Sequence, residues 1–432
     1  MPFESAPAAP RRIAVIGGGI SGLGAAHFLA GAHRVTLYEA EPRLGGHART
    51  VIAGKRGDQP VDMGFIVFNH VNYPLLTRLF DDLRVPVAKS NMSFGVSIDG
   101  GRFEYALRTP GALFAQKRNF LNPGYLGMLR DILRFNARGY TLSRQDGMTV
   151  GVLLQELRLG RRFREHYLLP FSGAIWSVPK EQILDFPARA MLDFFHNHAL
   201  LGVTGQHQWY TVKGGSVQYV DRLTASLRKA GVELRAGAPV DWVRRGPEGV
   251  TVKTPGAEPE LYDEVIFATH SDQAMRIIAD PTEQERASVG RIAYQPNDVV
   301  LHSDATVMPR RRIAWSSWNY TEAAGQRGDR IGVSYWMNSL QPIPQDDPLF
   351  VSLNMTTRIR EEHIHDQVRF DHPVYDAAAL AAQAEVARIN GTNRTWFCGA
   401  WMKYGFHEDG LSSGHDVAQA ILRRAETDMV AA

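Results

Sequence analysis

Residues 13–50 read IAVIGGGISGLGAAHFLAGAHRVTLYEAEPRLGGHART, and their order predicts the fold. An apolar, β-branched run at 13–16 leads into a glycine turn at 17–22, an alanine-rich helix at 23–30 and a second strand at 34–38. This order is a βαβ unit that carries the spacing G-x-G-x-x-G. The sequence therefore predicts an α/β protein whose parallel sheet binds a dinucleotide, against the alternative of a βαβ unit without a ligand.

Each residue of the glycine turn has an expected task. Gly17 permits the tight turn, Gly19 lets the backbone approach a pyrophosphate, and Gly22 lets the helix pack closely on the strand. The unpaired N–H groups at the start of the helix attract negative charge. Ile20 and Ser21, which open this helix, therefore belong to the expected phosphate site.

An acidic residue ends the second strand, and another glycine turn follows it. Glu39 stands at the spacing of a ribose ligand, and its charge disfavours a 2′-phosphate, so NADP is not expected. The continuation AEPRLGGH at 40–47 resembles the E-x-x-x-R-x-G-G signature of the flavin amine oxidase and phytoene desaturase superfamily. The resemblance implies FAD as the cofactor, held by Ala40, Arg43, Leu44, Gly45, Gly46 and His47.

Further segments match motifs of the same superfamily. They are a D-x-G strand at 61–66, an adenine-holding segment at 238–240, an A-T strand at 264–269 and a closing strand, loop and helix start at 396–414. The additional cofactor residues implied by this resemblance are Gly64, Phe65, Ile66, Val240, Ala268, Gly399, Glu408, Gly410, Leu411 and Ser412.

The closing motif is expected to direct a helix N-terminus at the flavin. The resemblance implies that the N–H groups of Gly410 and Leu411, and a helix beginning at Ser412, point at the flavin N1–C2=O edge and stabilise its anionic reduced form. The chain departs from the pattern in two places. Ala400 follows Gly399 where relatives have an aspartate, and His47 stands where many have arginine.

The resemblance also implies the domain organisation. We expect a Rossmann-like FAD-binding domain of the glutathione-reductase type at 10–71, 206–275 and 391–427. An interleaved α+β substrate domain at 72–205 and 276–390 is expected to contain a mixed sheet and a helical subdomain. Leu, Phe and Arg at helical spacing predict that 72–205 is mostly helical.

Composition is ordinary for an α/β enzyme. The chain has 432 residues, a net charge of +3 and 44% hydrophobic residues, which gives no nucleic-acid footprint. The single cysteine, Cys398, excludes an internal disulfide and suits a reducing cytoplasm. It lies in an apolar run and is interpreted as a buried thiol, so the FAD is expected to be non-covalent. The leader MPFESAPAAP lacks the order of an export signal, and no transmembrane span is expected.

The substrate is less clearly indicated. Conventional amine oxidases of the superfamily place a lysine near the flavin, and this chain has no lysine between Lys253 and Lys403. Trp401 or Tyr404 supplies one member of the aromatic pair that flanks the flavin in such enzymes, or packs in the core. A run of basic, aromatic and aliphatic residues at 114–138 predicts either contact with an anionic membrane or an amphipathic helix with a solvated basic face.

These features favour an apolar small molecule or a lipid acyl chain as the substrate. The expected location is the cytoplasm, with peripheral association at the inner face of the membrane as an extension. The sequence carries no signal for the oligomeric state.

Three short motifs sharpen the resemblance. GGH at 45–47, AIWS at 174–177 and YGFHEDGL at 404–411 resemble a bacterial branch associated with fatty-acyl methyltransferases, which includes the methylated fatty-acyl desaturase of furan fatty acid biosynthesis. The expected function is hydride transfer from such an acyl chain to flavin N5. A flavin-dependent double-bond isomerase, an amine oxidase and a non-enzymatic flavin module stay open.

A desaturase also needs a group that accepts a proton. His407 is the first candidate, because it adjoins the closing motif, with Tyr404 and Glu408 behind it. His407 alternatively only braces the loop. His196 and His198 are weaker candidates, and no metal site is expected.

Overall fold

The computed structural model describes residues 9–176, 180–202, 204–325, 332–355 and 357–431. Most of the leader at 1–8 and Ser177 of the AIWS motif lie outside the described residues. Among the helices of these ranges, none combines the length and apolar character that crossing a bilayer requires.

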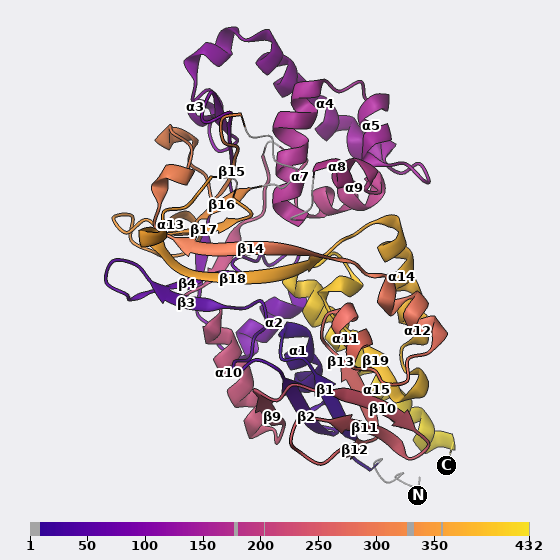
Figure 1. Ribbon diagram of the computed structural model, residues 1–432. Helices are drawn as coiled ribbons and strands as arrows, with labels where there is room; N and C mark the ends of the chain where they lie inside the picture. The colour runs from indigo at the N-terminus through magenta and orange to yellow at the C-terminus, as the bar shows by residue number, and fades with distance from the viewer. Residues whose placement is uncertain (1–8, 177–179, 203, 326–331, 356, 432) are drawn as a thin grey trace, which may run out of the picture.

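A parallel sheet forms the lower part of the molecule in Figure 1. Its strand order is β19-β13-β1-β2-β9, so three distant segments of the chain meet in one sheet. The predicted βαβ unit is β1, α1 and β2, with β1 paired to both β2 and β13. The bounds are β1 Arg12–Ile16, α1 Ile20–Leu29, β2 Arg34–Glu39, β9 Glu233–Ala236, β13 Glu264–Phe267 and β19 Thr395–Phe397.

Both faces of this sheet are covered, as a parallel sheet requires. Ile13 and Val15 face a core shared with α1, α2, α10 and α15, whereas Ala14 and Ile16 face a three-stranded antiparallel sheet. The bounds are α2 Pro74–Asp82, α10 Val217–Lys229 and α15 His407–Ala431, and β10 Trp242–Gly246, β11 Gly249–Lys253 and β12 Glu260–Tyr262 for the small sheet. Near it lie α11 Ser271–Ile277, α12 Glu283–Ala287 and α14 Ala377–Ile389.

A seven-stranded mixed sheet lies above the parallel sheet in Figure 1. Its order is β18-β14-β17-β16-β15-β6-β7, and the pairing of β15 with β6 is parallel whereas the other pairings are antiparallel. The bounds are β6 Phe94–Ile98, β7 Phe103–Ala106, β14 Tyr294–His302, β15 Trp318–Thr321, β16 Val333–Trp336, β17 Phe350–Leu353 and β18 Ile364–Pro373.

A helical layer caps the mixed sheet at the top of Figure 1. Its apolar side chains share one core with the mixed sheet. The elements are α3 Pro110–Leu113, η1 Lys117–Leu121, α4 Pro123–Leu142, α5 Val150–Glu156, α6 Arg161–Phe163, the π-helical turn η2 Arg164–Leu168, α7 Leu169–Trp176, α8 Lys180–Asp185 and α9 Ala188–Asn197. The predicted α/β fold with a mixed sheet and a helical subdomain is confirmed.

The expectation of helix is wrong between residues 87 and 106. This stretch forms β5 Val87–Ser90, β6 and β7. The whole of β6 is buried because it pairs with β15, more than two hundred residues later. β5 pairs with β8 Trp209–Val212, and β3 Thr50–Ala53 pairs with β4 Gln59–Asp62. Long-range pairing overrides the local pattern here.

Candidate functional site

One large cavity links the parallel sheet to the helical layer. Its volume is about 1230 Å³, more than a single small-molecule pocket usually measures. The nucleotide-side wall contains Gly17, Gly19 and Glu39, and the far wall contains Phe171 and Ile175. Two ligands, a cofactor and a substrate, can therefore lie end to end in this space.

The glycine turn is built as its spacing predicts. Gly17 has φ of +111°, and a Cβ atom there would lie 2.7 Å from the carbonyl oxygen of Ala268. A Cβ atom on Gly22 would lie 1.9 Å from the carbonyl oxygen of Gly17. At Gly19, by contrast, an added Cβ atom would meet no described atom within 4 Å. Gly17 and Gly22 are needed for packing, whereas Gly19 leaves space on the cavity wall.

The second glycine turn is tied directly to the first. The backbone N–H of Gly45 donates to the carbonyl oxygen of Gly18 over 2.8 Å. The carboxylate of Glu39 accepts from the N–H of Gly18 at 2.6 Å and from the N–H of Glu41 at 2.8 Å. Because a carboxylate offers about four acceptor positions, Glu39 retains capacity for ribose hydroxyl groups.

Arg43 provides a test of whether this groove fits an anionic ligand. Its guanidinium donates to the carbonyl oxygens of Gly46 at 2.9 Å and Ala48 at 3.3 Å, and it pairs with Glu41 at 3.0 Å. Its Nε atom is buried and has no hydrogen-bond partner among the described residues. A buried donor without a partner on a cavity wall fits a ligand that supplies an acceptor, such as a pyrophosphate.

Most of the predicted cofactor residues line this cavity. They are Gly17, Gly19, Ile20, Ser21, Glu39, Ala40, Arg43, Gly45, Gly46, His47, Gly64, Phe65, Ile66, Val240, Ala268 and Gly399. Gly22 and Leu44 lie just behind this wall, where Gly22 approaches Gly17 and Leu44 approaches Gly18.

The C-terminal helix begins earlier than predicted. α15 starts at His407 rather than at Ser412, and the N–H of Gly410 donates within the helix to Phe406 at 3.0 Å. The predicted helix start at Ser412 is therefore wrong, and the N–H of Gly410 is already engaged within the helix. Helices leave the N–H groups of their first turn unpaired, and this turn is at residues 407–409.

Gly410, Leu411 and Ser412 contact other parts of the protein. Gly410 packs against Ile20 and Ser21 of α1, and the side chain of Leu411 is fully buried against Gly24. The Ser412 hydroxyl accepts from Lys403 at 2.7 Å.

Glu408 also differs from expectation. Its two carboxylate oxygens each accept a backbone N–H at 2.9 Å, from Leu75 and from Leu76 at the start of α2. It is absent from the cavity wall, so neither the ribityl contact nor the catalytic role predicted for it fits this position. The carboxylate instead caps the N-terminus of α2, where a negative charge is stabilising.

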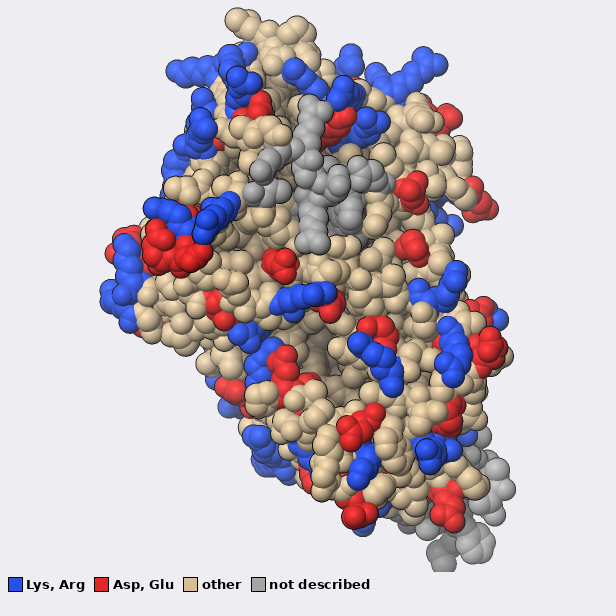
Figure 2. Space-filling view, in the orientation of Figure 1, with Lys and Arg blue, Asp and Glu red and all other residues tan. Residues whose placement is uncertain are grey.

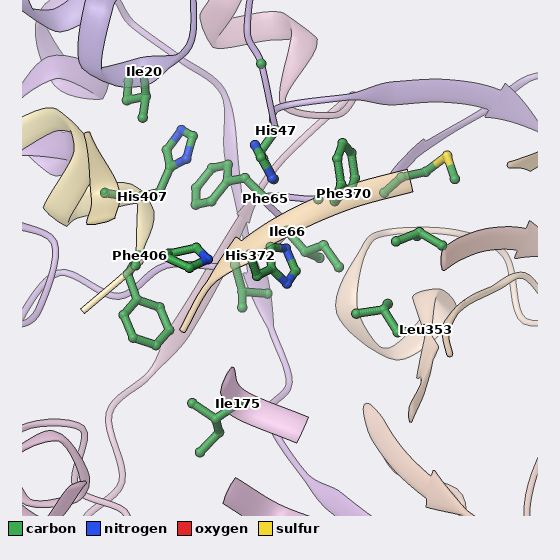
Figure 3. Close-up of a pocket in the computed structure, with 18 of the residues that line it drawn as sticks. Ile20, His47, Phe65, Ile66, Ile175, Leu353, Phe370, His372, Phe406 and His407 are labelled. Carbon is green, nitrogen blue, oxygen red and sulfur yellow. The ribbon is translucent and has the colours of Figure 1, made fainter. Parts of the chain in front are cut away.

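His407 lies on the cavity wall, stacked on Phe65 at a centroid distance of 3.9 Å (Figure 3). Its Nε2 atom is 2.7 Å from the hydroxyl of Tyr219. Burial lowers the pKa of His407 to about 3, and burial raises the pKa of Tyr219 well above its usual range. The protonated tyrosine can therefore donate to Nε2 of a neutral imidazole, which is a weak base with that atom already engaged.

The remaining catalytic candidates are divided. Tyr404 is 37% exposed and is absent from the cavity wall. His196 is exposed and stacks on Tyr140 at 4.2 Å. His198 does line the cavity, stacked on Phe194 at 3.9 Å, and burial lowers its pKa to about 4.

A three-histidine cluster, His47, His270 and His372, also lines the cavity. The ring centroid of His47 is 5.9 Å from that of His270 and 5.7 Å from that of His372, and His47 stacks on Phe370 at 4.5 Å (Figure 3). Burial, followed by mutual repulsion, lowers the pKa of His47 well below 6.5 and that of His372 to about 4. Burial also lowers the pKa of His270, so all three rings are neutral near pH 7.

A hydrogen-bond chain selects the tautomer of His372. The N–H of Asp298 donates to Oδ1 of Asn354 at 3.1 Å, which leaves Nδ2 of Asn354 to donate to Asn297 at 2.7 Å. Nδ2 of Asn297 then donates to the carbonyl oxygen of Gln295 at 2.9 Å and faces Nδ1 of His372 at 3.2 Å. Nδ1 must accept, so the neutral His372 ring carries its proton on Nε2.

His372 and its partner Asn297 were not among the residues predicted from the sequence. The alternation of Val368, Phe370 and His372 along β18 was the available signal, because a strand places such residues on one face. Asp62, the aspartate of the D-x-G strand, was predicted as part of that motif but without a role; it is fully buried and accepts from Ser216, Thr50 and Gln341. Asp62 joins β4 to the start of α10 and to a loop of the upper layer.

The far part of the cavity is apolar and aromatic. In Figure 3 Ile175 lies apart from the imidazole rings, across the open space. The wall there is formed by side chains from α4, α7, α9 and the mixed sheet, among them Phe94, Leu129, Ile132, Phe171, Phe194, Trp318, Tyr335 and Leu353. In the described ranges, no group of three or more His, Cys, Asp or Glu residues is arranged to hold a metal ion.

Comparison with protein families gives one match over most of the chain. The model of the flavin containing amine oxidoreductases matches residues 20–332. The second glycine turn at 45–46 and the A-T strand at 264–269 fall within these residues.

Individual relatives are distant. A carotenoid phi-ring synthase from Streptomyces griseus is 28% identical over 310 residues, which are 66% of this chain and 58% of that protein. The structure resembles a fatty acid isomerase from P. acnes, with a TM-score of 0.64 and 16% identity over 96% of this chain and 98% of the other. It also resembles cyclohexylamine oxidase from Brevibacterium oxydans IH-35A, with a TM-score of 0.67 and 16% identity over 97% and 100%. At such identities the two structures show a shared fold alone.

Proposed function

Because the chain belongs to the family of flavin-containing amine oxidoreductases, we propose that it is an FAD-dependent desaturase of an unsaturated, methyl-branched fatty-acyl chain. FAD dependence follows from the family, whereas the substrate and the reaction are the proposal. The proposal rests mainly on the cavity that runs from the glycine turns to an apolar chamber. A long hydrocarbon chain suits such a wall, since burying it there gains free energy for each methylene group.

The FAD is proposed to be held without a covalent bond. The thiol of Cys398 is fully buried and absent from the cavity wall, and burial raises its pKa to about 12. A thiol in that state is not a nucleophile at neutral pH. Its environment supports the expected non-covalent cofactor.

When bound, FAD supplies the two-electron acceptor that takes a hydride from an allylic carbon of the substrate. Loss of the hydride leaves positive charge on the substrate, and aromatic faces attract such charge. Phe65, Phe370 and Phe406 stand on the wall beside the imidazole rings (Figure 3). A proton must then leave the neighbouring carbon to complete the new double bond, and a second electron acceptor must reoxidise the flavin.

We assign the proton-accepting role to His47. Its ring packs on Phe370, lines the cavity and has no hydrogen-bond partner among the described residues, so its nitrogens are available to a ligand. His372 carries its proton on Nε2 and His407 has Nε2 engaged by Tyr219. A carbon next to a cationic centre is strongly acidic, so even a weakly basic imidazole suffices.

The alternatives differ in chemistry rather than in fold. An amine oxidase would need to bind a polar head group, and the far chamber is lined mostly by hydrocarbon and aromatic side chains, with Asn136 and His198 as polar exceptions. A double-bond isomerase has the same requirements as a desaturase, but it returns the hydride to the substrate. Because the fold resembles that of a fatty acid isomerase, we retain the double-bond isomerase as the second candidate function.

The test is anaerobic addition of lipids to the purified FAD-loaded protein, followed by absorption spectroscopy. The probes are oleic acid, a methyl-branched monounsaturated fatty acid, a phosphatidylglycerol carrying that acyl chain, and putrescine. We expect one branched acyl probe to bleach the flavin and to yield a product two hydrogen atoms lighter. Bleaching by putrescine alone would contradict the proposal, and a product of unchanged mass without bleaching would replace the desaturase with an isomerase.

A further inference from the structure

Large apolar side chains project from the tip of the helical layer. We call Phe120, Leu121, Leu126 and Leu133 the apolar tip; these residues of η1 and α4 are 55%, 89%, 43% and 57% exposed. Single exposed apolar residues are common, but four large ones on two consecutive helical elements indicate an interaction site.

The apolar tip is held in place by packing beneath it. Phe120 stacks on Phe114 at a centroid distance of 3.9 Å, and the side chain of Asn122 caps α4 by accepting from Tyr125. On the inward face of α4, Tyr125, Met128 and Phe135 are buried. The outward display of the tip therefore follows from how α4 is seated in the fold.

Positive charge surrounds the apolar tip. Between residues 107 and 138 the basic side chains are Arg108, Lys117, Arg118, Arg130, Arg134 and Arg138, and the only acidic one is Asp131. Asp131 is buried, where it pairs with Arg130 and accepts from the N–H of Gly160. Figure 2 shows the result at the top of the view, where an uncharged end of the molecule is flanked by Lys and Arg.

The cavity reaches the surface beside this tip. Leu107, Arg108 and Leu133 line the cavity and are also exposed, Leu107 by 39%. Behind them Leu113 and Leu129 continue the apolar wall inward. A molecule leaving a surface that covers the tip would thus meet the mouth of the cavity without crossing water.

We propose that the apolar tip and its basic surround dock on an anionic lipid bilayer. Apolar side chains next to basic ones suit the interface, because the former enter the acyl boundary while the latter bind anionic head groups. Docking in this orientation sets the cavity mouth against the lipid. That delivery role rests on the proposed function, whereas bilayer binding itself does not.

The test is flotation of the holoprotein with vesicles in about 0.1 M salt, where exposed charges separated by less than about 10 Å still interact. The vesicles contain either phosphatidylcholine alone or a mixture of phosphatidylglycerol and phosphatidylcholine. We expect binding to the mixed vesicles, little binding to the neutral ones, and release at high salt. No substrate turns over in this assay, so its outcome is independent of the reaction catalysed.

Two variants separate the apolar and the basic contributions. Leu121→Ser is expected to weaken partitioning about tenfold, and the double variant Lys117→Gln/Arg118→Gln about thirtyfold at about 1 kcal/mol per charge. The matched controls are Ile52→Ser on β3, a residue 60% exposed, and Arg228→Gln/Lys229→Gln at the end of α10. These controls should stay within twofold of the unchanged protein.

Flavin absorbance and a melting curve establish that each variant is folded. The proposal is overturned if the unchanged holoprotein stays unbound with the mixed vesicles, which would leave a protein partner as the occupant of the tip. It is equally overturned if the control variants lose as much binding as the tip variants.

Discussion

His47 and His407 stand on the same cavity wall, but their rings are held in different ways. His407 is fastened by stacking on Phe65 and by the Tyr219 hydroxyl, which lies 2.7 Å from Nε2. His47 is stacked on Phe370 with its nitrogens open to the cavity. His407, with one nitrogen held in a hydrogen bond, is suited to orient its neighbours. His47, whose nitrogens form no hydrogen bond with the described residues, is suited to exchange a proton.

Replacing His47 tests that difference through chemistry. We expect His47→Gln to bind FAD with normal absorbance but to slow anaerobic flavin reduction by about a hundredfold or more, the usual contribution of a general base. His196→Gln, at an exposed ring away from the cavity wall, should change neither quantity. An unchanged reduction rate in His47→Gln with full FAD content would remove His47 from the mechanism.

Replacing His407 tests the difference through stability. Its folded pKa of about 3 is far below the unfolded value near 6.5, so the neutral form stabilises the fold fully above pH 6.5 and less as the pH falls toward 3. Between pH 6.5 and 5 this residue should cost the protein about 2 kcal/mol of unfolding free energy.

His407→Gln should reduce the acid-side loss of unfolding free energy by about that amount in urea titrations at the two pH values, since the other buried histidines still contribute. The exposed His365→Gln variant should retain it. Equal losses in the unchanged protein and in His407→Gln would show that the ring is not held neutral. Full turnover with normal FAD content in His407→Gln would also exclude a direct chemical role.

Among the helices, strands and turns, the sequence predicted those whose shape depends on residues close together in the chain. The turn at 17–22 could be predicted because its backbone shape depends on the glycines themselves: Gly17 has φ of +111°, and Gly22 lies against the carbonyl oxygen of Gly17. The start of α15 could not be predicted in this way, because Glu408 in its first turn accepts from the N–H groups of Leu75 and Leu76, more than three hundred residues earlier. The motif placed the helix start at Ser412, five residues too late, and so misplaced the role of Glu408.

Gly19 allows the cofactor groove to be tested apart from the fold. Its added Cβ atom would meet no described atom, so Gly19→Ala should melt within a few degrees of the unchanged apoprotein while its affinity for FAD falls at least tenfold. Gly31→Ala is the matched control, since Gly31 also has free space around it but lies past the end of α1. Calorimetric titration of the apoprotein with FAD measures the affinity, and unchanged binding in Gly19→Ala would place the pyrophosphate elsewhere.

Across the whole molecule, the site is assembled from segments that no local pattern connects. His47 follows the second glycine turn, His270 follows β13, and His372 lies on β18 of the other sheet. Sequence motifs predicted most residues of the cofactor groove, because those residues belong to short motifs of fixed spacing. For the chamber, the sequence predicted only that its wall would be apolar. Which residues form that wall depends on how α4, α7 and the mixed sheet pack.

Asp62 helps to hold those two sides together. Its carboxylate accepts from Ser216 before α10 at 2.7 Å and from Gln341 of the upper layer at 2.9 Å. Burial raises the pKa of Asp62 to about 6 despite these donors. The relative position of cofactor groove and chamber therefore depends on a buried carboxyl group that bridges both.

The depth of the chamber should decide which acyl chains are accepted. Ile175 lies on the chamber wall across the open space from the imidazole rings, so Ile175→Phe adds volume where the far end of a chain would lie (Figure 3). We expect the KM for long acyl chains to rise about tenfold, with shorter chains and flavin absorbance little affected, because one or two displaced methylene groups are worth about 1–3 kcal/mol. The control Val152→Phe, at a residue of α5 that is 43% exposed and absent from the cavity wall, should alter neither KM. Equal KM values for long and short chains in Ile175→Phe would mean that the chain runs in another direction from the imidazole rings.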